Sequence, residues 1–202
     1  MENKVQNKKL IAIGEALIDF IPESAGSAIK DVNAFLPAVG GAPANVCGAF
    51  TKLGGKSEMI TQLGMDGFGD KILDAFKEAG IGSSYVKRTD TANTSLAFVA
   101  LKEDGNREFS FYRNPGADML FRAEDVQKEW FEDVYALHFC SVSLGDFPMK
   151  EAHCIAIQYA LENDAIISFD PNLRPALWKN QNEMIETVKE FIPLADIIKI
   201  SD

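Results

Sequence analysis

The segment with the most distinctive chemistry spans residues 39–46 and reads Val-Gly-Gly-Ala-Pro-Ala-Asn-Val. Gly40 and Gly41 lack a Cβ, so the backbone can turn there and approach a ligand closely. Pro43 favours a first helical turn, and the amide of Asn45 can both donate and accept hydrogen bonds. The segment therefore predicts a cradle for a small polyhydroxy molecule, and an ordinary turn from loop to helix is the alternative.

A carboxylate precedes this cradle. Asp19 follows Gly14 and an apolar stretch, near the end of an expected central strand. Ligands of open α/β sheets gather at the carboxyl ends of strands, and a carboxylate there can accept hydrogen bonds from two hydroxyl groups. We therefore expect Asp19 to bind the ligand, with a partly exposed acid at a strand end as the alternative.

A third set of polar residues lies in segment 168–175, Ser-Phe-Asp-Pro-Asn-Leu-Arg-Pro. Asp170, Asn172 and Arg174 are two residues apart on an extended segment, so they are expected on a common side. An acid, an amide and a guanidinium suit a phosphate and its metal, because Arg binds phosphate through two hydrogen bonds. An internal ion pair between Asp170 and Arg174 is the alternative.

Aromatic and polar residues alternate along segment 109–113, Phe-Ser-Phe-Tyr-Arg. Aromatic side chains on one face of such a strand can exclude water from a polyol, and Arg113 could reach down over it. A plain packed hairpin is the alternative.

By contrast, Gly64-Met-Asp-Gly-Phe-Gly69 lacks the spacing of a phosphate-binding loop. We expect Asp66 to cap a helix instead.

These residues need an α/β scaffold to position them. Helix-like and strand-like segments alternate along the chain, which predicts a mostly parallel sheet with helices on both faces. Segments 17–39 and 94–114 break the alternation; the second contains an Asp-Gly hairpin turn, and together they predict a small β lid. We expect one α/β domain over 1–202. The expected strands are 10–14, 57–64, 134–140, 165–169 and 195–200, and the expected helices are 42–53, 67–79, one after 124, 148–162 and 181–192.

Composition narrows the possible partners. The chain has 202 residues and a formal net charge of −10, so nucleic acid and anionic membranes are unfavourable partners. Cys47, Cys140 and Cys154 are widely spaced, which predicts reduced thiols. Neither an N-terminal signal-like run nor a segment near the roughly 20 apolar residues of a membrane span is present, and a cytoplasmic protein is expected.

Taken together, these motifs resemble the ribokinase and phosphofructokinase-B family of sugar kinases, most closely its bacterial fructokinases. The resemblance rests on Gly40-Gly41-Ala42-Pro43-Ala44-Asn45 with Gly54 and Gly64, on Gly14 to Asp19, on Tyr112-Arg113 with Ala117-Asp118, and on Asp170 to Arg174. It covers essentially the whole chain.

The resemblance implies a Rossmann-like (ribokinase-like) body with a β lid over a sugar cleft. Asp19, Gly40, Gly41 and Asn45 would hold the sugar hydroxyls, and Phe98 and Arg113 would close over the sugar. Asp170, Asn172 and Arg174 would face the phosphate and magnesium, with no side chain as a direct metal ligand. ATP and Mg²⁺ are the implied cofactors, the implied reaction is phosphoryl transfer to fructose, and a homodimer through the lid is expected.

One family motif is missing from these residues. The Gly-Ala-Gly-Asp helix start that supplies the catalytic base in such kinases does not occur in the sequence, so the resemblance implies the N-terminal two-thirds of a kinase. We expect this chain to bind sugar weakly and to be inactive alone. The alternatives are a non-catalytic sugar-binding or dimerisation module, and a kinase for another sugar such as 2-keto-3-deoxygluconate.

Overall fold

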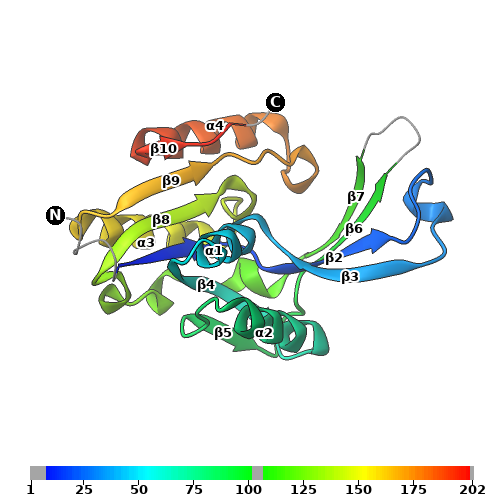
Figure 1. Cartoon of the computed structure of the whole chain (residues 1–202). Helices are drawn as coiled ribbons and strands as arrows, with labels where there is room; N and C mark the ends of the chain where they lie inside the picture. Colours follow the sequence, from blue (N-terminus) through cyan, green and yellow to red (C-terminus); the bar gives the residue numbers. More distant parts are fainter. Residues whose placement is uncertain (1–7, 102–106, 201–202) are drawn as a thin grey trace.

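The computed structural model describes residues 8–101 and 107–200, which form two sheets (Figure 1). In the larger sheet every neighbouring pair of strands is parallel. This confirms the expected parallel α/β body. The strand order is β10 (Ile197–Ile198), β9 (Ile166–Asp170), β8 (Val134–Cys140), β1 (Lys9–Ile13), β4 (Lys56–Gly64) and β5 (Val86–Thr89).

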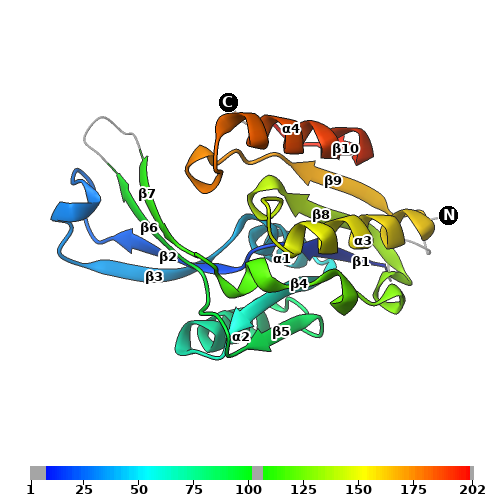
Figure 2. The same ribbon diagram turned by 180° about the vertical axis from the view of Figure 1, so that it is seen from behind.

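Helices cover both faces of this sheet, because apolar side chains along the strands point alternately to one face and to the other. Ile11 and Ile13 of β1 pack into one apolar cluster, which also contains Ala156 of α3 and Phe191 of α4. Leu10 and Ala12 point the other way, into a second cluster with residues of α1 and α2. Figure 2 shows α3 on the near side of the sheet and α1 behind it. The helices are α1 (Ala42–Lys52), α2 (Gly67–Ala79), α3 (Met149–Glu162) and α4 (Gln181–Phe191).

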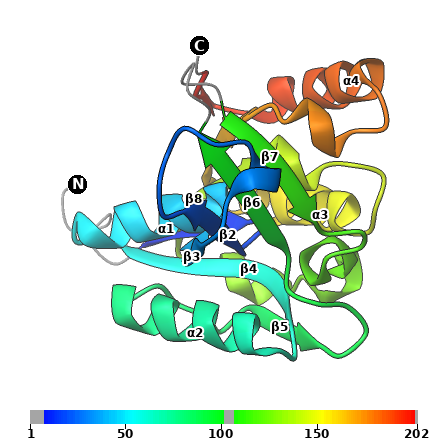
Figure 3. The ribbon, with the colours of Figure 1, turned by 90° about the vertical axis from the view of Figure 1, so that its right-hand side faces the viewer.

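The smaller sheet is the predicted lid, which extends away from the body (Figures 1 and 3). Its strands are β3 (Phe35–Gly40), β2 (Leu17–Pro22), β6 (Leu96–Leu101) and β7 (Arg107–Tyr112), in that order. Strand β2 pairs antiparallel with β3 and parallel with β6, while β6 and β7 form a hairpin. The predicted Asp-Gly turn at 102–106 lies outside the described residues.

Helix α2 has the bounds that its sequence predicts, because residues at both of its ends cap it. The side chain of Asp66 accepts hydrogen bonds from the backbone N–H groups of Phe68 and Gly69 and so caps α2, as expected. At the other end, Gly80 adopts a left-handed φ of 72°, which stops the helix.

Two features differ from the expectations. The helix expected after residue 124 is wrong: Ala123–Asp125 and Lys128–Phe131 form separate 3₁₀ turns. Val126 turns into the core between them, and Phe131 is buried at the end of the second turn. Strand β5 was not expected, since its sequence Val-Lys-Arg-Thr is short and mostly polar. Within the parts of the chain that are described, no helix has both the length and the apolar character to cross a bilayer.

Candidate functional site

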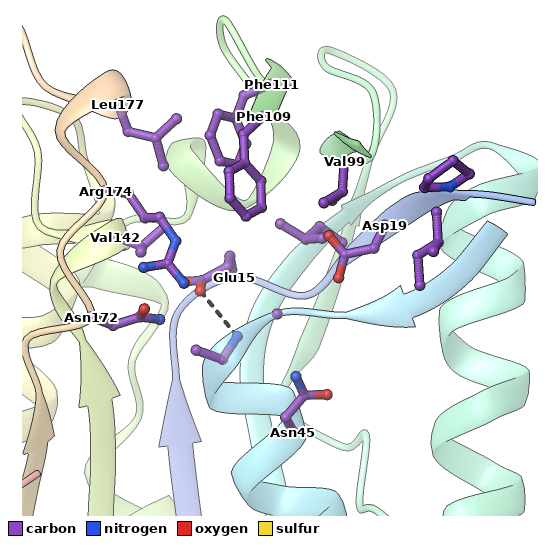
Figure 4. A pocket seen from close by; sticks show the side chains of 15 residues that line it. Glu15, Asp19, Asn45, Val99, Phe109, Phe111, Val142, Asn172, Arg174 and Leu177 are labelled. Carbon is purple, nitrogen blue, oxygen red and sulfur yellow. Dashed lines mark hydrogen bonds between the residues drawn. The ribbon is translucent and has the colours of Figure 1, made fainter. Parts of the chain in front are cut away.

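A cleft of about 380 Å³ lies between the lid and the carboxyl edge of the parallel sheet (Figure 4). Its volume is at the lower end of the range of roughly 300–1,000 Å³ for small-molecule sites. Residues from the smaller sheet, from the start of α1 and from the segments after β1, β8 and β9 line it. They are Glu15, Leu17, Asp19, Ile21, Pro22, Gly41, Ala42, Asn45, Val99, Phe109, Phe111, Val142, Asn172, Arg174 and Leu177.

The Gly-Gly turn brings α1 into the cleft. Gly41 has a φ of 106°, and a Cβ on it would lie 2.5 Å from the carbonyl oxygen of Glu15, so only glycine fits. Helix α1 begins at the next residue, and Asn45 lies on its first turn, facing the cleft. This arrangement agrees with the interpretation of segment 39–46 as a ligand cradle.

Asp19 projects into the cleft from the third position of β2 (Figure 4). Partial burial raises the pKa of its carboxyl group, and the positive charge of Arg174 opposes this shift. Gly40 lies opposite Leu17 in the pairing of β2 with β3, and a Cβ there would overlap the Asp19 carboxylate. Gly40 thus makes room for Asp19 and is not itself among the lining residues.

Asn172 and Arg174 face Asp19 across the cleft (Figure 4). The guanidinium of Arg174 lies over the ring of Phe109, 5.8 Å from its centroid, and so links the segment after β9 to the lid. Asn172 has a left-handed φ of 39°, which breaks the alternation expected for segment 170–174. Residues 170 and 172 therefore do not share a side.

Asp170 accordingly lies outside the cleft, which corrects the expectation that it faces the ligand. Its carboxylate accepts a hydrogen bond from the backbone N–H of Asn172 at 3.0 Å and pairs with Lys199 at 3.1 Å. Its ion-pair partner is thus Lys199 of the segment after β10, rather than Arg174. Asp170 holds the Asn172 turn in place.

The lid presents an apolar surface to the cleft. Phe109 and Phe111 of β7 stack with centroids 5.7 Å apart, and Val99 of β6 lies beside them. The expectation that aromatic residues on one face of this strand cover the cleft agrees with this geometry. Such a surface excludes water from whatever binds beneath it.

Phe98 does not cover the cleft, and the strand register explains why. It pairs with Ser110, so it shares the lid face opposite to that of Phe109 and Phe111. There its ring stacks on Phe20 at 4.6 Å and contacts Phe35 edge-on at 5.2 Å. Phe98 therefore stabilises the lid. The expectation that it contacts the ligand is wrong.

Arg113 is likewise displaced from its expected role. Its side chain is only 4% exposed and forms an ion pair with Asp118. It also donates a hydrogen bond to the carbonyl of Val142 at 3.2 Å. These partners hold Arg113 behind the cleft, because β7 has ended at Tyr112 and the chain turns inward.

Glu15 is also part of the site, although the sequence motifs did not indicate it. Glu15 is 2% exposed, and its carboxyl group lies at the floor of the cleft, where it accepts a hydrogen bond from the Ala42 N–H (Figure 4). It also accepts a hydrogen bond from the Ser143 hydroxyl. The only signal was its position directly after Gly14 at the end of β1. An acid at a strand end could have been placed beside Asp19 on that ground.

The chemistry of the lining favours a small, uncharged, hydroxyl-rich ligand. Asp19, Asn45, Asn172 and Arg174 offer acceptors and donors, and aromatic rings cover them. Arg174 is the single cation among the residues that line the cleft, against two carboxyl groups. Across the described residues, no group of three or more His, Cys, Asp or Glu side chains could hold a metal ion.

Comparisons with known proteins agree with this picture. Residues 7–202 match the family model described as pfkB family carbohydrate kinase. The chain is 44% identical over 193 residues to the probable fructokinase-5 of Arabidopsis thaliana, covering 96% of this chain and 60% of that protein. It is 42% identical to the fructokinase-2 of Solanum lycopersicum, covering 96% of this chain and 59% of the relative.

Solved structures give the same result. The fructokinase from Xylella fastidiosa superposes with a TM-score of 0.85 at 42% identity, over 94% of this chain and 58% of that one. A second structure of that enzyme, with bound ATP, also gives 0.85 and 42%, over 95% and 60% of the two chains. The present chain thus spans about 60% of the length of the relatives that it matches.

Proposed function

The chain belongs to the pfkB family of carbohydrate kinases, and from this premise we propose that its cleft binds fructose as the acceptor of a phosphoryl group from ATP. The observation that carries the proposal is the lining of the cleft. A carboxylate and two amides lie around a space of about 380 Å³ beneath aromatic rings. Fructokinases from plants and a bacterium are similar to the chain at 42–44% identity.

Each lining residue has a distinct task in this proposal. Asp19 accepts hydrogen bonds from sugar hydroxyls, and Asn45 both donates and accepts. Phe109 and Phe111 exclude water above the sugar, which strengthens the polar contacts beneath. These residues orient one hydroxyl toward the side of the cleft that Asn172 and Arg174 line.

The residues on that side fit a phosphate group. Arg174 offers a guanidinium, whose planar donors match phosphate oxygens, and Asn172 adds an amide at the same edge. Bound ATP would supply the phosphoryl group, and Mg²⁺ held on its phosphate oxygens would need no direct side-chain ligand. The positive charge of Arg174 would stabilise the negative charge of the transferring group.

Because the Gly-Ala-Gly-Asp motif is not within residues 1–202, we propose that this chain corresponds to the N-terminal, sugar-binding part of such a kinase. The test measures ATP consumption with fructose, glucose, ribose and 2-keto-3-deoxygluconate. It compares the 202-residue chain with the protein read from its gene past codon 202. We expect turnover of fructose by the longer protein only.

The outcomes separate the alternatives. Turnover by the 202-residue chain would contradict its proposed inactivity, and preference for another sugar would replace fructose as the substrate. A stop codon directly after Asp202, with fructose binding intact, would favour a non-catalytic sugar-binding module.

We also propose that two chains associate through their lids. Ile21 and Leu36 lie opposite each other in the pairing of β2 with β3 and are 45% and 60% exposed. Such paired apolar side chains on a projecting sheet are favourable to bury against a second copy. Light scattering should give twice the chain mass, and Leu36→Glu should give the monomer mass.

A further inference from the structure

The buried carboxyl group of Glu15 makes contacts that the proposed roles above do not use. One oxygen, Oε1, accepts a hydrogen bond from the backbone N–H of Ala42 at 3.2 Å. The other, Oε2, accepts a hydrogen bond from the hydroxyl of Ser143 at 2.8 Å. Both oxygens are therefore engaged by the protein, although the residue lies at the floor of the cleft.

These contacts join three elements at the carboxyl edge of the sheet. Glu15 follows β1, Ala42 is the first residue of α1, and Ser143 ends the 3₁₀ turn after β8. Helix α1 has no side-chain cap of its own, because its N-cap residue is Gly41, and no acidic residue lies in its first turn. The carboxyl group of Glu15, which lies outside the helix, supplies the hydrogen-bond acceptor that the first turn of α1 lacks.

The backbone of Glu15 reinforces the same contact. A Cβ on Gly41 would lie 2.5 Å from the Glu15 carbonyl oxygen and 3.1 Å from the Cα of Ala16. The turn that carries Gly41 therefore packs directly on the segment that carries Glu15. Together the side chain and the backbone fix where α1 begins, and with it the place of Asn45 in the first turn.

Two charged groups at the base of the lid, Arg113 and Asp118, act on this acid. Arg113, directly after β7, pairs with Asp118, and Asp118 accepts a hydrogen bond from Ser95, which precedes β6. Burial raises the pKa of the Glu15 carboxyl group, and the positive charge of Arg113 opposes that rise. The base of the lid hairpin is thus electrostatically coupled to the acid that holds α1.

We propose that Glu15 is a positioning residue, which fixes the start of α1 and so places Asn45 against the lid for sugar binding. The second half of this inference rests on the proposed function. The first half concerns the protein without sugar and can be tested separately.

The test compares Glu15→Gln with Glu15→Ala. The glutamine amide retains both partners, because its oxygen can accept from Ala42 and its nitrogen can donate to Ser143. Alanine removes both contacts. Hydrogen exchange of the Ala42 amide should be at least about tenfold faster in Glu15→Ala, since a hydrogen bond to a buried acid is lost. Fructose affinity, measured by calorimetry, should fall about tenfold in Glu15→Ala and stay within about threefold in Glu15→Gln.

Asn180→Ala is the matched control. Asn180 caps α4 by accepting a hydrogen bond from the Glu183 N–H at 2.9 Å, and it is not among the residues that line the cleft. Its loss should speed exchange in α4 and leave Ala42 and the fructose affinity unchanged. If Glu15→Ala fails to fold, Ser143→Ala provides the test, because it removes only one of the two contacts. Ser143→Ala should weaken fructose binding, but by less than the roughly tenfold loss expected for Glu15→Ala.

The outcomes separate the two proposals. The positioning role would be overturned if hydrogen exchange at Ala42 were unchanged in Glu15→Ala. It would also be overturned if the fructose affinity were unchanged in Ser143→Ala. Equal loss of affinity in Glu15→Gln and Glu15→Ala would also overturn it, because it would mean that the carboxylate itself binds the sugar. Faster exchange at Ala42 in a protein that binds no sugar would support the positioning of α1 and overturn the proposed function instead.

Discussion

At the scale of single residues, the site depends on a few polar groups whose neighbours set their properties. Asp19 projects from the lid toward Arg174, and Gly40 leaves room for its carboxylate. Arg174 in turn lies over the ring of Phe109. The surroundings of Asp19 and Arg174 are therefore set by groups from other elements.

Asp19 makes fructose binding dependent on pH. Partial burial raises its pKa above the ordinary value of 3.8, so the carboxylate takes up a proton earlier as the pH falls. Because the charged form is the better acceptor for hydroxyl groups, affinity should be full near pH 7 and decline on acidification from above pH 3.8. Calorimetric titrations from pH 7 downward should show this decline.

Asp19→Asn is the control for that dependence. The amide does not titrate, so its affinity should be about tenfold weaker at pH 7 and should lack the Asp19 contribution to the decline. Identical pH profiles for the two proteins would contradict the assignment of Asp19 as a sugar ligand.

At the scale of elements, the turn between β3 and α1 connects the lid to the body. Gly41 adopts a φ of 106° and packs on the backbone of Glu15. This glycine thus meets two separate requirements, one of conformation and one of space.

A pair of substitutions separates the two requirements. Gly54 also has a positive φ, 92°, but a Cβ there would meet nothing within 4 Å. Gly54→Ala should lower the free energy of unfolding by about 1–3 kcal/mol, the typical cost of such backbone strain. Gly41→Ala should cost more, because its Cβ also meets the Glu15 carbonyl. Urea unfolding measures both, and equal losses would contradict the close packing of the turn.

Sequence reasoning succeeded for elements with local signals. The bounds of α2 follow from Asp66 before it and Gly80 after it, and strands β6 and β7 of the lid follow from the hairpin signal in segment 94–114. The 3₁₀ turns after residue 122 and the short strand β5 have no comparable local signal, because packing against the core sets them.

For the site, the motifs pointed to most of the polar residues that line the cleft, but they did not reveal which side chains turn away from it. Asp19, Gly41, Asn45, Asn172 and Arg174 line the cleft, as the motifs predicted. The misplacement of Phe98 could have been avoided from the hairpin register. Arg113 is buried by its ion pair with Asp118, five residues further along the chain, and by its hydrogen bond to the Val142 carbonyl. Only the second of these partners is remote in the sequence.

At the scale of the whole molecule, a projecting lid and a parallel sheet enclose the cleft. Two buried histidines lie in the α/β body that contains this sheet. His138 lies on β8, and His153 lies on α3, where its Nδ1–H donates to the Met149 carbonyl at 2.7 Å. Burial lowers the pKa of each to about 4. Neither histidine lines the cleft, so their effect is on stability.

The sign of that effect follows from proton uptake. With a pKa of about 4 in the folded state and 6.5 in the unfolded state, His153 binds more protons in the unfolded chain between these values. Its contribution is therefore full above pH 6.5 and is lost as the pH falls toward 4, by roughly 3 kcal/mol in total. In urea unfolding, His153→Gln should show a shallower loss of stability across this window. A slope equal to that of the wild type would contradict the account of His153.

The central claim is that the cleft between the lid and the parallel sheet binds fructose, and chemical-shift mapping of the ¹⁵N-labelled 202-residue chain tests it most directly. We predict that fructose shifts the amide signals of Asp19, Gly41, Asn45 and Arg174 in a saturable way, and leaves that of Phe98 unchanged. Saturable shifts confined to the groove between α1 and α2, lined by Gly48, Ala75 and Ile81, or no shifts at any fructose concentration, would contradict the account.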